Sequence, residues 1–71
     1  MAEEIRAPLA GKIVQINISV GDQVQDEDEV LVMEAMKMET PVFAPCDGTV
    51  KEINIKEGDA VEEDQLLSVI E

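Results

Sequence analysis

Short apolar segments alternate with turn residues along the whole chain, and no apolar pattern runs unbroken for long. Turn signals occur at matched places, in residues 8–11 and 45–48 and again in residues 21–22 and 58–59. The segments between them are dominated by Ile and Val, which favour strands, and none keeps helical spacing over two turns. The pattern predicts eight short strands. They are expected near residues 4–7, 12–18, 23–24, 30–35, 38–43, 49–55, 60–61 and 66–71.

The second half of the chain repeats the first, with an offset of 37 residues and no gaps. Residues 5–34 align with residues 42–71, and the identical pairs are Ala7/Ala44, Pro8/Pro45, Gly11/Gly48, Ile16/Ile53, Asn17/Asn54, Ile18/Ile55, Gly21/Gly58, Asp22/Asp59, Val24/Val61, Val32/Val69 and Glu34/Glu71. Two copies are too few for a solenoid. We therefore expect the halves to close on each other around a pseudo-two-fold axis. The connecting turn, residues 35–41, then lies at one end of the molecule and both termini at the other.

The second predicted strand of each half changes its apolar parity partway along. Residues 13, 16 and 18 do not share one face of a regular strand, and neither do residues 50, 53 and 55. A β-bulge or strong bend after the first apolar residue of each set produces this change. Bent strands in two matched halves favour an all-β single domain over residues 1–71. The expected architecture is a flattened antiparallel barrel or sandwich of two four-stranded sheets.

Composition excludes several classes of function. The net charge of −12 disfavours binding to nucleic acid or to anionic membrane surfaces. The chain has no histidine and one cysteine, so zinc sites and Cys/His nucleophile sites are excluded, and the acidic runs lack the spacing of a calcium loop. Cys46 aligns with Leu9 and is expected to be a small apolar filler. No apolar run is long enough to span a bilayer and no signal peptide opens the chain, so we expect a cytoplasmic protein.

The connecting turn holds the candidate chemistry. It contains Lys37, flanked by Met36 and Met38 within the run Glu34-Ala35-Met36-Lys37-Met38-Glu39. Three of the four methionines lie within residues 33–38, and methionine is common on surfaces that a partner recognises. Core packing at the end of the barrel is an equal alternative for Met36 and Met38. Lys37 could also be an ordinary exposed lysine, which is how we interpret Lys12, Lys51 and Lys56.

The run Ala35-Met36-Lys37-Met38 resembles the attachment motif of biotinyl domains, the biotin carboxyl carrier family, and the similarity extends over residues 5–71. The resemblance implies the biotinyl/lipoyl fold, with biotin joined covalently to Lys37 by a biotin protein ligase. Glu34, Ala35, Met36 and Met38 would form the surrounding site. The domain would itself be non-catalytic. It would carry a carboxyl group between partners such as a biotin carboxylase and a carboxyltransferase or decarboxylase component.

The chain departs from the family pattern at two loop positions. Many members carry glycine where Glu27 and Asp64 stand. Because Asp tolerates a left-handed backbone better than Glu does, we expect the loop either to be strained at Glu27 or to have a different shape. The gapless repeat leaves no room for the protruding thumb of some acetyl-CoA carboxylase carriers. Carriers of the transcarboxylase, decarboxylase or pyruvate carboxylase type are therefore the better match. A lipoyl carrier is an alternative, although lipoyl domains usually have Asp-Lys-Ala at this turn. An unmodified interaction barrel is another.

Overall fold

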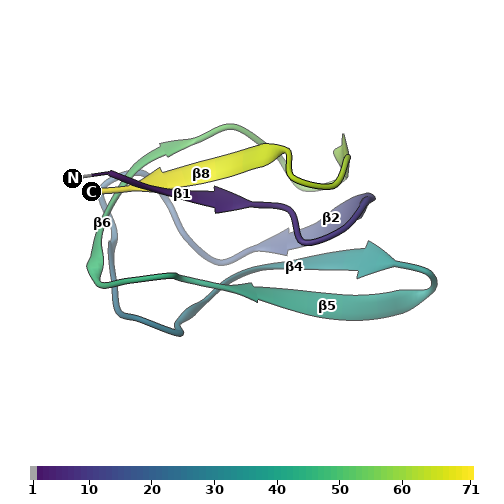
Figure 1. Cartoon of the computed structure of the whole chain (residues 1–71), viewed down its shortest axis with the longest axis horizontal. Coiled ribbons are helices and arrows are strands. Elements are labelled where there is room, and N and C mark those ends of the chain that lie inside the picture. The colour runs from purple at the N-terminus through teal and green to yellow at the C-terminus, as the bar shows by residue number, and fades with distance from the viewer. Residues whose placement is uncertain (1) are drawn as a thin grey trace.

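Eight β-strands and no helix make up residues 2–71, which are the residues that the computed structural model describes (Figure 1). All eight were predicted, but the second and sixth are two residues shorter at their ends than expected. The strands are β1 (Glu3–Arg6), β2 (Gly11–Ile16), β3 (Gln23–Val24), β4 (Glu29–Ala35), β5 (Met38–Phe43), β6 (Gly48–Ile53), β7 (Ala60–Val61) and β8 (Leu66–Ile70).

Each sheet takes two strands from each half of the repeat. The strand orders are β1-β8-β6-β3 and β5-β4-β2-β7, and every pairing is antiparallel. Exchanging each strand for its counterpart 37 residues away in the other half converts one order into the other. The two halves are thus interleaved around a pseudo-two-fold axis, and the predicted two-sheet all-β fold is confirmed.

Backbone hydrogen bonds between the halves follow the same symmetry. The amide of Ile13 donates to the carbonyl of Asp59 at 2.8 Å, and the equivalent amide of Val50 donates to the carbonyl of Asp22 at 2.8 Å. Because neither half satisfies these groups alone, each half depends on the other for its backbone pairing. The strand register also shifts after Ile13 in the β2–β4 pair and after Val50 in the β6–β8 pair. These are the two predicted bulges.

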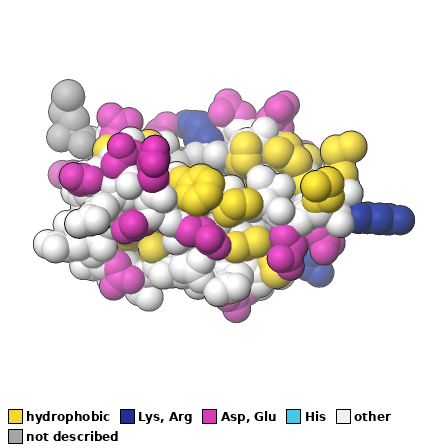
Figure 2. Space-filling model, turned by 90° about the horizontal axis from the view of Figure 1, so that it is seen from below, with side chains coloured by type: hydrophobic (Ala, Val, Ile, Leu, Met, Phe, Trp, Pro, Cys, Tyr) yellow, Lys and Arg dark blue, Asp and Glu magenta, His cyan; other side chains and the backbone are white. Residues whose placement is uncertain are grey.

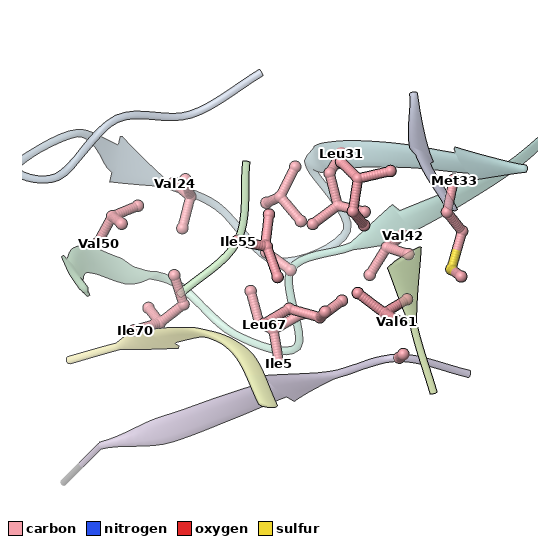
Figure 3. Packing of buried hydrophobic residues seen from close by; sticks show 14 residues of the cluster. Ile5, Val24, Leu31, Met33, Val42, Val50, Ile55, Val61, Leu67 and Ile70 are labelled. Atoms are coloured by element: carbon pink, nitrogen blue, oxygen red, sulfur yellow. The ribbon is translucent and has the colours of Figure 1, made fainter. Parts of the chain in front are cut away.

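The core lies between the sheets and is almost wholly aliphatic (Figure 3). Cys46 packs against its edge, as expected for an apolar filler. The deepest position near the connecting turn is filled by Met33, which is 0% exposed. The buried cluster comprises Ile5, Ala7, Ile13, Val24, Val30, Leu31, Met33, Val42, Ala44, Val50, Ile55, Val61, Leu67 and Ile70.

Outside the connecting turn, two non-glycine residues of the described chain adopt the left-handed backbone. Glu27 and Asp64 each have a φ of 70°, and they are related by the repeat. The amide of Glu27 donates to the carbonyl of Ala44 at 2.9 Å, and that of Asp64 to the carbonyl of Ala7 at 2.8 Å. Of the two alternatives for Glu27, the left-handed, strained backbone is the one present, and matched cross-half hydrogen bonds hold the backbone at both positions.

Candidate functional site: the lysine hairpin

The connecting turn is a tight β-hairpin. Strands β4 and β5 pair from Glu29 opposite Phe43 to Ala35 opposite Met38, which leaves Met36 and Lys37 as a two-residue loop. The φ angles of these two residues are 54° and 65°. Positive φ at both positions is the pattern of a type I′ turn, whose twist matches that of the flanking strands. The loop therefore continues the strands without splaying them.

The amino acids at this turn are not the ones that its backbone prefers. Type I′ turns favour Asn-Gly or similar pairs, because an L side chain in the left-handed region costs roughly 1–2 kcal/mol. Met36 and Lys37 both carry that cost. Strained residues persist where the surrounding structure determines their conformation, and they cluster at functional sites. Here the long strand pairing below the turn imposes the conformation.

The methionines beside Lys37 project into solvent. Met36 is 89% exposed and Met38 is 69% exposed, and Lys37 itself is exposed. Core packing, the alternative left open for both, is therefore wrong. Met33 is the one methionine of the cluster that belongs to the core. The turn thus presents an amine between two flexible apolar side chains.

Two small residues support the base of the hairpin. Ala35 is buried, although Glu34 beside it is exposed. Gly11, at the start of β2, approaches so closely that a Cβ there would overlap the carbonyl oxygen of Glu34 and lie 3.2 Å from the Cβ of Ala35. The sequence indicated only a turn glycine at position 11. Its role in fixing the hairpin against β2 depends on strand packing, and no local sequence signal reveals it.

The hairpin is acidic on its outer face. Glu34 and Glu39 lie opposite each other in the β4–β5 register, and both are exposed. Lys37 takes part in neither of the salt bridges found within residues 2–71. The tip lysine is therefore not held by a carboxylate.

One of these two salt bridges lies far from the tip and joins Lys51 to Glu71. The hydrogen bond and charge of Lys51 lower the pKa of the Glu71 carboxyl.

The hairpin tip and the chain termini lie at opposite ends of an elongated molecule (Figure 1). The molecule measures 32 × 17 × 16 Å, and the tip lies at one end of its long axis. This is the placement that the repeat predicted. In the described part of the chain, no cluster of acidic or cysteine side chains could hold a metal ion. There is also no helix there of the length and apolarity needed to cross a membrane.

A family model described as "Biotin-requiring enzyme" matches residues 3–70. The chain belongs to this family. Among biotin-requiring relatives, the biotinylated protein TB7.3 of Mycobacterium tuberculosis is 41% identical over 44 residues, which are 62% of this chain and 62% of that protein. The alignment thus spans less than two thirds of that relative. The 1.3S subunit of methylmalonyl-CoA carboxyltransferase from Propionibacterium freudenreichii is 57% identical over 37 residues, 52% of this chain and 30% of the subunit.

The fold of this biotin-requiring family member also occurs within solved carboxylases. The crystal structure of the Kluyveromyces lactis urea carboxylase contains a region that superimposes with a TM-score of 0.92 and 38% sequence identity. It covers 99% of this chain but 6% of that carboxylase. A long-chain acyl-CoA carboxylase matches with a TM-score of 0.90 and 28% identity, over 96% of this chain and 7% of that one. In both cases a small domain of this fold forms part of a much larger enzyme.

Proposed function

We propose that this domain carries biotin on Lys37 and moves a carboxyl group between two active sites of a biotin-dependent carboxylase, decarboxylase or transcarboxylase. The observation that carries the proposal is the lysine hairpin. A rigid, strained turn exposes an unpaired lysine between two exposed methionines, at the end of the molecule away from its termini. The methionines on both sides of Lys37, and the similarity to a biotinylated protein, support the choice of biotin over lipoate.

The geometry of the tip fits covalent attachment. Attachment would join the Nζ of Lys37 to the carboxyl carbon of biotin as an amide, after a base of the ligase had taken a proton from the ammonium group. ATP would activate that carboxyl group, and the activating group would leave as the amide formed. Since Met36 and Met38 extend away from the core and Lys37 is exposed, the amine can be reached from solvent.

The domain contributes position and reach to the proposed transfer. Once attached, biotin supplies a ring nitrogen that accepts a carboxyl group at one active site and releases it at another. The hairpin holds the Cα of Lys37 in place, and the four-carbon stem of the lysine lets its end move. A tethered group of this kind has a high effective concentration at every site it can reach. The partner enzymes would supply the catalytic groups, as expected for a non-catalytic carrier.

The proposed partners are a biotin protein ligase together with carboxylase, carboxyltransferase or decarboxylase components. The net charge of −12 supports partners with basic docking surfaces. Because the ligase reaction consumes ATP, we propose the cytoplasm as the location of the modification.

The deciding experiment is incubation of the protein with biotin protein ligase, ATP and biotin, followed by mass measurement and peptide mapping. We expect one biotinyl group, on Lys37. The Lys37→Arg variant should gain none, and its stability should stay within about 0.5 kcal/mol of the parent because the side chain is exposed. Biotin found instead on another lysine would refute the assignment. The lysines that serve as internal controls are Lys12, Lys51 and Lys56.

A further inference from the structure

The outer face of the lysine hairpin carries exposed apolar side chains below the tip. On β5 the side chain of Val42 is 7% exposed and faces the core, so its neighbours Pro41 and Phe43 face outward. Phe43 is the single aromatic residue of the chain, and it is 51% exposed. Val32 lies opposite Pro41 on β4 and is half-buried. We name Val32, Pro41 and Phe43 the outer patch.

Acidic side chains border the outer patch at both ends. Glu29 lies opposite Phe43 in the strand register, and Glu27 lines a surface hollow together with Phe43. Toward the tip the next cross-strand pair on the outer face is Glu34 and Glu39. Figure 2 shows this face, with hydrophobic side chains between groups of acidic ones. The complementary surface on a partner would be an apolar pocket flanked by lysine or arginine.

The ligase is the partner that depends most on the protein surface. It acts before biotin is attached, so it can recognise only the side chains and backbone of the carrier, whereas later enzymes can also bind the cofactor. Specific protein–protein interfaces bury roughly 800 Å² on each partner, which is more than a two-residue loop can supply. The outer patch lies on the same rigid hairpin, about 13–20 Å along β5 from Lys37. It can therefore enter the interface without any rearrangement.

We propose that the outer patch is the docking surface of the carrier for its biotin protein ligase, with Phe43 as the apolar anchor and the bordering glutamates facing basic groups of the enzyme. This inference rests on the proposed biotinylation of Lys37. It adds to that proposal a recognition site outside the attachment motif.

The test is steady-state kinetics of a bacterial biotin protein ligase, with ATP, biotin and the whole chain as protein substrate. Phe43→Ser should raise the KM for the carrier about five- to tenfold, a larger effect than truncation of most interface residues has, and leave kcat unchanged. Phe43→Leu, which keeps an apolar side chain, should recover most of the loss. Val20→Ser is the matched control, because Val20 is 64% exposed in the loop between β2 and β3 and lies outside the hairpin. Its KM should equal that of the parent.

Thermal unfolding of every variant separates docking from folding. A raised KM in Phe43→Ser with a melting temperature close to that of Phe43→Leu supports the inference. Equal KM values for Phe43→Ser, Val20→Ser and the parent would overturn it while leaving biotinylation of Lys37 intact. A change in the oligomeric state of Phe43→Ser on gel filtration, with no change in its KM, would also overturn the inference. The outer patch would then be a contact between copies of the chain. If the parent itself gains no biotin, the proposed function fails first.

Discussion

Replacing Glu27 by glycine tests how much strain the loops of the domain contain. Glu27 has a φ of 70°, and its side chain is exposed. The substitution therefore removes a side chain from the left-handed region without removing a buried contact. The cross-half hydrogen bond from the amide of residue 27 to Ala44, 2.9 Å long, is retained because it comes from the backbone.

Two opposing effects determine the size of the change. Relief of the left-handed conformation is worth roughly 1–2 kcal/mol for an ordinary L residue. Glycine also gives the unfolded chain more freedom, which costs about 0.4–1 kcal/mol. The net stabilisation should lie between zero and about 1.5 kcal/mol. For a chain of this size each kcal/mol corresponds to a rise in melting temperature of about 4–8 °C. Asp64→Gly, with the same φ of 70°, should gain less because Asp tolerates this region better.

Urea and thermal unfolding of the parent and both variants at neutral pH would measure these differences. The two variants form a matched pair, since the repeat relates their positions and their backbone hydrogen bonds. Clear destabilisation by Glu27→Gly would refute the account. It would mean that the carboxylate has a stabilising role in the loop that outweighs its backbone strain.

Four further substitutions test other parts of the structure. Gly11→Ala should destabilise the fold by about 1–3 kcal/mol in urea unfolding, because its Cβ would push β2 away from the hairpin. Met36→Leu and Met38→Leu should leave the melting temperature unchanged and slow biotinylation; unchanged rates in both would show that the ligase does not use them. The Lys51–Glu71 contact lowers the pKa of Glu71. It should therefore stabilise the fold fully at pH values above 4.5, the ordinary pKa of the carboxyl, and this contribution should be lost as the pH falls through the lowered pKa. The difference in melting temperature between parent and Lys51→Gln should therefore shrink at acid pH.

Most of the fold could be predicted because the two halves of the chain carry the same sequence pattern. A turn signal or a change of parity is weak evidence by itself, but its recurrence after 37 residues identifies it as structural. The bulges after Ile13 and Val50 are an example. The same repeat predicted that Lys37 lies at the end opposite the termini, because a connector between symmetric halves must cross near their axis.

What could not be predicted depends on contacts between distant strands. Local sequence does not say which of three neighbouring methionines enters the core, since the register of β4 against β5 decides it. Gly11 resembled a turn residue, although its requirement comes from its approach to β4. The outward position of Phe43 likewise follows from the pairing of β5, because an aromatic residue taken alone suggests the core.

The hairpin illustrates why the best-folding residues are absent where the function is proposed to lie. A type I′ loop of Asn-Gly would remove most of the strain that Met36 and Lys37 carry, which is roughly 1–2 kcal/mol for each residue. It would also remove the amine and one of the two exposed thioethers. A chain of 71 residues buries little surface, so strain of this size is a large fraction of the few kcal/mol that stabilise such a fold. The presence of this strain fits selection for the side chains of Met36 and Lys37 themselves. The interleaved strands below the turn then have a second role, since they hold in place a loop that its own sequence disfavours.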